Sequence, residues 1–118
     1  MLNNYRRKIS TYYDEEIAYI DNIKLTSTAP GSSRHLYVIR VKDRDKLVKY
    51  LKKNKILVQF HYPYSLNKTR ALSRKIKEVK LTNSEKWAKE CISLPLHPNM
   101  SINEAKRTVN FIKKYYRY

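Results

Sequence analysis

Apolar and polar residues follow two different periods along the chain, and these periods divide it into helical and extended segments. Residues 3–23 carry apolar side chains at spacings of three and four, which predicts an amphipathic helix with a wide apolar face. Small polar residues and the Pro30-Gly31 pair predict a loop over residues 24–34. Residues 35–42 are rich in β-branched and aromatic side chains without a breaker, and they predict the strongest strand of the chain.

The next segments continue this alternation. Asp43 is expected to cap a helix over residues 44–54, because its carboxylate can accept hydrogen bonds from free backbone N–H groups. The apolar run over residues 56–60 predicts a second strand. A loop over residues 61–68 and a short, very basic helix over residues 69–77 are expected to follow it.

Two capping boxes open the last two helices. The hydroxyls of Thr82 and Ser101 each precede a glutamate by three residues, which predicts helices that run to about Cys91 and Tyr116. Residues 92–94 between them predict a third short strand. Together the segments predict an α+β fold, a small three-stranded and mainly antiparallel sheet with helices packed on one face.

Length and composition narrow the class of protein. The 118 residues suit a single domain, with a long linker-type helix at about residues 1–24 and an α+β unit at residues 35–118. The one glycine, Gly31, excludes a Walker A loop and a dinucleotide-binding fingerprint. The one cysteine, Cys91, excludes an intramolecular disulfide and a zinc site built on several cysteines. No apolar run approaches the ~20 residues of a membrane span, and no secretory signal is present, so we expect a cytoplasmic protein.

The chain carries 26 basic and 10 acidic residues, a formal net charge of +16. Because the basic residues are spread over the whole chain, one interpretation is that they only solvate its surface. The other interpretation is a nucleic-acid partner. In that case Arg70, Arg74 and Lys75 are candidate phosphate contacts, and Tyr62 and Tyr64 are candidates to stack on bases.

Few residues have the pattern of a catalytic or metal site. His35 opens a strand, where a structural role is expected, although it is also a weaker candidate for binding. His61 follows a predicted strand and enters a loop, the usual position of binding groups. Cys91 is expected to be a small buried apolar residue. No carboxylate pair suits general acid–base chemistry, so we predict neither a catalytic residue nor a metal site.

Three stretches, taken in order, resemble a known family. Residues 35–41 precede an Asp-Arg-Asp-Lys-Leu segment at 43–47, the sequence Ile-Leu-Val-Gln-Phe-His-Tyr-Pro occupies 56–63, and the third stretch is 84–98. Over about residues 5–116, this set resembles the C-terminal part of DegT/DnrJ/StrS-type aminotransferases. Those enzymes use pyridoxal phosphate (PLP) to aminate nucleotide-linked keto-sugars.

The resemblance implies the small C-terminal domain of a fold-type I aminotransferase. In that family the lysine that forms the Schiff base with PLP lies in the large domain, as do the groups that hold the phosphate and the ring nitrogen. We therefore expect no cofactor to be bound by this chain alone. A separately encoded large domain that binds PLP is the partner that the resemblance implies.

The resemblance also points to a substrate cleft. In the family the His-Tyr-Pro loop faces that cleft, which makes His61 and Tyr62 the best candidate contacts. Further along, the family usually has Pro, then Leu-His, then Gln. At the corresponding positions this chain has Ser65, then Leu66-Asn67, then Thr69. Asn67 therefore stands where a second histidine is expected, and it is a weaker candidate for the substrate cleft, as are Tyr64 and His35.

Three functions follow from these observations. The first is a stand-alone C-terminal domain, or fragment, of a nucleotide-sugar aminotransferase that is not catalytic by itself. The second is a basic nucleic-acid-binding module, and the third is a small-molecule-binding domain that uses His61 and Tyr62 without catalysis. The wide apolar face of the first helix further predicts a homodimer through an exposed patch at Tyr12 and Tyr13.

Overall fold

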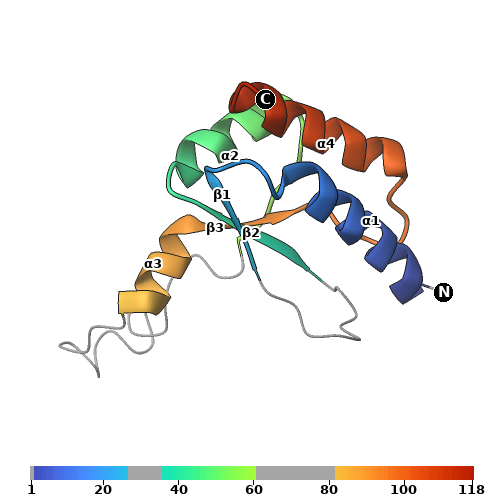
Figure 1. The fold of residues 1–118 in the computed structure, drawn as a ribbon, viewed down its shortest axis with the longest axis horizontal. Coiled ribbons are helices and arrows are strands. Elements are labelled where there is room, and N and C mark those ends of the chain that lie inside the picture. Colours follow the sequence, from blue (N-terminus) through green and yellow to red (C-terminus); the bar gives the residue numbers. More distant parts are fainter. Residues whose placement is uncertain (1, 27–35, 61–81) are drawn as a thin grey trace.

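The computed structural model describes residues 2–26, 36–60 and 82–118. Four helices and three strands follow one another along the chain (Figure 1). In order, they are α1 (Leu2–Ile17), β1 (Ile23–Leu25), β2 (Tyr37–Val41), α2 (Arg44–Lys53), α3 (Thr82–Glu90), β3 (Cys91–Leu94) and α4 (Ile102–Tyr115). The predicted loop over 61–68 and the predicted helix over 69–77 lie outside the described residues.

The three strands form one antiparallel sheet in the order β1-β2-β3. Ile39 at the centre of β2 lies opposite Leu25 on one side and Ile92 on the other. Helices α1, α2 and α4 cover one face of the sheet (Figure 1). The predicted fold class, an α+β domain built on a small antiparallel sheet, is confirmed.

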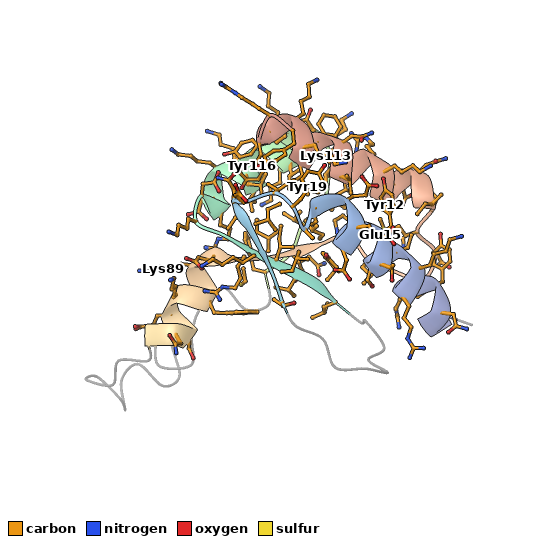
Figure 2. The ribbon with its side chains drawn as sticks, in the orientation of Figure 1. Tyr12, Glu15, Tyr19, Lys89, Lys113 and Tyr116 are labelled. Carbon is orange, nitrogen blue, oxygen red and sulfur yellow. The ribbon has the colours of Figure 1, made fainter. Side chains whose placement is uncertain are left out.

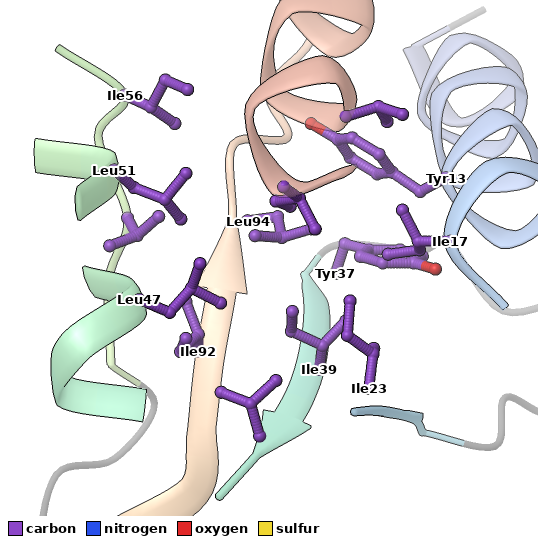
Figure 3. Packing of buried hydrophobic residues seen from close by; sticks show 14 of the residues in the cluster. Tyr13, Ile17, Ile23, Tyr37, Ile39, Leu47, Leu51, Ile56, Ile92 and Leu94 are labelled. Carbon is purple, nitrogen blue, oxygen red and sulfur yellow. The ribbon is translucent and has the colours of Figure 1, made fainter. Parts of the chain in front are cut away.

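The core lies between the sheet and these three helices. In β2 the buried residues alternate with half-buried ones, so Tyr37, Ile39 and Val41 all point toward the helices. Figure 3 shows side chains from α1, α2, β2 and β3 meeting in this layer. The other face of β2 carries Arg40, whose guanidinium pairs with Glu90 at 2.9 Å and lies 5.4 Å from the Trp87 ring. These contacts attach α3 to the opposite face of the sheet.

The first helix is shorter than its apolar spacing predicts. The helix ends at Ile17, and the chain then makes turns in which the N–H groups of Ile20 and Ile23 each bond a carbonyl three residues back. Asp21 and Asn22 between them favour turns because their side chains compete for the backbone. Both isoleucines remain buried, but Ile23 belongs to strand β1, which the helical spacing of residues 3–23 did not predict.

The strand predicted over residues 56–60 is reduced to one bridge. Ile56 and Val58 are buried while Leu57 is exposed, so the segment keeps the period of a strand. Only Gln59 pairs, with Ser93 of β3. Pairing cannot continue toward Leu57, because Pro95 opposite it has no N–H group. The third full strand of the sheet is β1, which pairs with the other edge of β2.

Of the three expected helix caps, Ser101 and Asp43 differ in outcome, and the side chain of Thr82 lies outside the described part of the structure. Ser101 caps α4 as predicted, since its hydroxyl accepts a hydrogen bond from the Glu104 N–H at 3.2 Å. Asp43 occupies the cap position of α2, but its side chain makes no capping hydrogen bond. Its carboxylate instead accepts the hydroxyls of Tyr115 and Tyr116 at 3.0 and 2.8 Å. Asp43 therefore ties the end of α4 to the start of α2.

Candidate functional site

A groove of about 740 Å³ opens between the segment that follows α2 and the segment that follows β3. One wall is formed by residues 55–57 and Gln59, and the other by residues 93–98. The first two turns of α4, Arg6 of α1 and Leu36 complete the described lining. Residues far apart in the sequence therefore form this concave surface.

Hydrogen bonds hold the two walls in place. Gln59 and Ser93 exchange both backbone bonds, at 3.1 and 2.8 Å, which fixes the distance between the walls. The buried hydroxyl of Tyr13 donates to the Pro95 carbonyl at 2.7 Å. Tyr5 donates to the carbonyl of Met100, so α1 holds the segment after β3 at two points. The groove is thus supported by the core rather than by a free loop.

Positive charge predominates in the groove. Arg6, Lys55 and Arg107 line it, with Glu104 as the one acidic residue among the described lining. The Glu104 carboxylate lies 3.7 Å from Nε2 of His97, at the edge of the same groove. The Arg6 Nε is buried and has no hydrogen-bond partner among the described residues. These groups suit an anionic or hydrogen-bonding partner.

The walls also expose large apolar side chains. Leu57 is 81% exposed and Leu36 is 39% exposed, and both line the groove. Because these two leucines lie in one concave surface with other apolar side chains, the groove offers apolar contact area as well as charge to a partner. Leu57 was missed by sequence reasoning, although the buried Ile56 and Val58 on either side indicate by their period that it faces the other way.

The described residues have no constellation typical of catalysis. Within residues 2–26, 36–60 and 82–118, no group of three or more metal-ligating side chains comes together. Cys91 is completely buried, as predicted, so its thiol does not reach the groove. The described part of the groove can therefore bind a partner through cations, hydrogen bonds and apolar contacts. In the same segments, no helix is both long and apolar enough to cross a membrane.

Most of the site residues predicted from the sequence lie outside the described residues. They are His35, His61, Tyr62, Tyr64, Asn67, Arg70, Arg74 and Lys75. The structure does describe the two residues that precede His61 in sequence. Gln59 lines the groove, and the Phe60 ring packs against the core beneath the Arg44 guanidinium, 4.7 Å away. The residues just before His61 are therefore anchored beside the groove.

The prediction of an exposed tyrosine patch on α1 is wrong for Tyr13. Its side chain is completely buried, and its ring lies 4.8 Å from the ring of Tyr37. Burial raises the pKa of Tyr13 well above its usual range. A residue in the core cannot form an exposed dimer face.

The wide apolar face of α1 is covered within the domain by α4. Tyr12 is half-buried against the core, and burial raises its pKa. Nearby, the Lys113 ammonium lies 5.6 Å from the Tyr19 ring (Figure 2). It also pairs with the Glu16 carboxylate at 2.6 Å. The Glu16 carboxylate raises the pKa of Lys113. No missing domain is needed to explain this part of the apolar face.

Comparisons with known proteins agree with this fold. Residues 1–113 match the DegT/DnrJ/EryC1/StrS aminotransferase family. The dTDP-3-amino-3,6-dideoxy-alpha-D-galactopyranose transaminase of Aneurinibacillus thermoaerophilus is 35% identical over 115 residues, covering 96% of this chain and 31% of that protein. The UDP-4-amino-4,6-dideoxy-N-acetyl-beta-L-altrosamine transaminase of Campylobacter jejuni is 32% identical over 111 residues, covering 86% and 28%. The chain spans about a third of the length of these curated relatives.

Solved structures give the same result. The crystal structure of DesV from S. venezuelae matches 98% of this chain and 32% of its own length, with a TM-score of 0.92 and 26% identity. The aminotransferase TlmJ from Streptoalloteichus hindustanus matches 94% of this chain and 30% of its own length, with a TM-score of 0.82 and 25% identity. Since the family match spans nearly the whole chain, the chain belongs to the DegT/DnrJ/EryC1/StrS aminotransferase family.

Proposed function

We propose that this chain serves as the C-terminal small domain of a PLP-dependent nucleotide-sugar aminotransferase and is not catalytic by itself. One observation carries the proposal: 98% of the chain superposes on only 32% of DesV, at a TM-score of 0.92. The sequence match to the Aneurinibacillus transaminase has similar coverage, since it includes 96% of this chain and only 31% of that protein. The remaining two thirds of such an enzyme is a large domain, which must come from outside residues 1–118.

The described groove does not fit a complete PLP site. PLP chemistry needs a positioned lysine, an acidic partner for the ring nitrogen and a group of donors for the phosphate. Among the described lining residues the one carboxylate is Glu104, and it already pairs with His97. The groove does offer cations and an exposed leucine at position 57, which suit contact with another domain. We therefore assign PLP binding to the large domain.

Borohydride trapping tests whether the chain can use PLP alone. The purified chain is incubated with stoichiometric PLP and reduced, and the adducts are located by mass spectrometry. Because the 17 lysines of the chain react weakly with PLP at many surface sites, scattered trace adducts are expected. A single dominant, stoichiometric lysine adduct would show that the chain carries its own PLP site and would overturn the proposal.

A chimera tests the role of a small domain. Residues 1–118 replace the matching 115 residues of the Aneurinibacillus transaminase. The expected product is a folded protein that retains PLP-dependent transamination of the relative's dTDP-sugar substrate. The parent enzyme without its C-terminal third serves as the control and is expected to be inactive. A chimera that folds and binds PLP but does not transaminate contradicts the proposal.

We further propose that His61 and Tyr62 contact the sugar-nucleotide substrate in the assembled enzyme. The family resemblance of the His-Tyr-Pro segment supports this role, as does the anchoring of Gln59 and Phe60 beside the groove. In the chimera, His61→Ala is expected to raise KM for the dTDP-sugar, while an Asn67→Ala control has a smaller effect. Equal KM values for the His61→Ala chimera and its parent would contradict this assignment.

A further inference from the structure

The layer formed by α2 and α4 holds a concentrated positive charge. Residues 43–55 and 101–118 contain eleven Lys or Arg and three Asp or Glu, a net charge of +8 by subtraction. Half of the chain's net charge of +16 thus lies on about a quarter of its residues. Figure 2 shows side chains that end in nitrogen atoms and point outward from both helices. We call this surface the basic layer.

Most of these cations are exposed, and none of the exposed ones forms an ion pair within the described residues. Nine of the eleven are exposed, namely Lys46, Lys49, Lys52, Lys53, Lys55, Lys106, Arg107, Lys114 and Arg117. The three acidic residues of the layer are otherwise engaged: Asp43 with two tyrosine hydroxyls, Asp45 with Arg44, and Glu104 with His97. Within the described residues, no ion pair involves any of the nine. The layer therefore presents a field of one sign to solvent.

The two helices form a rigid support for this charge. The Tyr50 ring of α2 packs 5.0 Å from the Tyr115 ring and 6.2 Å from the Phe111 ring of α4. Arg107 donates to the Asn54 carbonyl at one end, and the Asp43 carboxylate accepts tyrosine hydroxyls at the other. The helices therefore run antiparallel with fixed spacing, which holds two rows of cations side by side.

Both helices also end with a cation in the left-handed region. Lys55 has φ 62° and Arg117 has φ 61°, at positions where glycine is the usual residue. This conformation costs a non-glycine residue roughly 1–2 kcal/mol. In both helices it belongs to a capping turn, in which the N–H of the left-handed residue bonds a carbonyl three residues back. Here it holds one cation at each end of the basic layer.

We propose that the basic layer binds the phosphate backbone of a nucleic acid without reading its sequence. Seven of the nine exposed cations are lysines, which act as flexible point charges rather than as bidentate readers of bases. An anionic membrane is a poorer match, because within residues 43–55 and 101–118 the one large apolar side chain that is exposed is Tyr118, whereas a membrane-surface helix presents a whole apolar face. The proposal does not depend on the aminotransferase role.

The size of the layer sets the expected strength of binding. The 14 residues of α4 extend about 21 Å at 1.5 Å per residue. That length matches about six base pairs of duplex, so roughly five phosphate contacts are within reach. With five contacts, log K should fall against log salt concentration with a slope of about −4 to −5. Nonspecific affinity of this kind is in the micromolar range at low salt.

The test is fluorescence anisotropy of a fluorescein-labelled 20-base-pair DNA duplex, titrated with the chain at 25–200 mM KCl. The double variant Lys49→Gln/Lys53→Gln is expected to reduce the slope by about 2 units and to weaken binding about 10- to 100-fold at 50 mM KCl. The control variant Lys86→Gln/Lys89→Gln removes the same charge from exposed sites on α3, where Figure 2 places Lys89 away from α4. It is expected to leave the slope nearly unchanged.

Three results would overturn the proposal. The first is no anisotropy change at 25 mM KCl with the folded wild-type chain. The second is an equal loss of affinity in both double variants, because binding would then follow net charge and not the basic layer. The third is tighter binding to vesicles containing 30% phosphatidylserine, with the same dependence on Lys49 and Lys53. Circular dichroism of each variant confirms that all proteins compared are folded.

Discussion

Replacing Lys55 by glycine is expected to stabilise the domain, although it removes a side chain and a charge. Helix α2 ends at Lys53, and the chain reverses through Lys55 at φ 62°. The Lys55 N–H bonds the Lys52 carbonyl at 3.0 Å, and the Ile56 N–H bonds the Leu51 carbonyl at 2.9 Å. This pair of bonds is a Schellman motif, which requires the left-handed conformation at position 55.

The magnitude follows from two opposing terms. For lysine the left-handed conformation is roughly 1–2 kcal/mol less favourable than the right-handed one, whereas glycine has no such penalty. Glycine in turn loses about 0.5–1 kcal/mol more conformational entropy when the chain folds. The Lys55 side chain is exposed, so its removal changes the free energy of unfolding little. The net gain is about 0.5–1 kcal/mol, or about 2–5 °C in Tm for a domain of this size.

Thermal unfolding by circular dichroism and urea titration measure this change. Lys55→Ala is the first control, because it retains the β-carbon and should stay within about 0.5 kcal/mol of wild type. Lys53→Gly is the second control, since glycine inside the helix costs up to about 1 kcal/mol. If Lys55→Gly is no more stable than Lys55→Ala, the left-handed strain at this position is refuted.

Four further predictions concern the core and the sheet. Tyr13→Ser should lower the free energy of unfolding by about 3–5 kcal/mol through a cavity, and light scattering should show no change in oligomeric state of the folded protein. Tyr13→Phe should cost about 1 kcal/mol, because the Pro95 carbonyl loses its donor, as urea titration will measure. Burial raises the pKa of Tyr13 and Tyr116 above their unfolded value of 10. The contribution of these tyrosines to the free energy of unfolding should therefore be complete below pH 10 and should fall as the pH rises above 10. A free energy of unfolding that stays constant from pH 9 to 11.5 contradicts this. Glu90→Ala should cost about 1–3 kcal/mol by leaving Arg40 largely buried without its ion pair, whereas Glu90→Gln should recover part of the loss in the same assay.

Local signals in the sequence were sufficient to predict those elements whose conformation depends mainly on neighbouring residues. The strand predicted over 35–42, which forms over 37–41, and the helix after Ser101 were predicted because β-branched runs and capping hydroxyls act within a few residues. The family resemblance and the α+β class also came from ordered local patterns, and both are confirmed. The assignments of His61 and Tyr62 to a substrate cleft remain predictions, since both residues lie outside the described part of the chain.

Tertiary structure decided which of the candidate strands pair and where several polar side chains bond. Ile23 follows the helical spacing of α1 yet pairs with Val41, because a strand is defined by its partner and not by its own pattern. Asp43 bonds tyrosines more than 70 residues away instead of its own helix. The groove and the basic layer both combine residues that are distant in sequence. Composition and periodicity therefore determined the class of the domain, whereas its surfaces depend on contacts that no local pattern encodes.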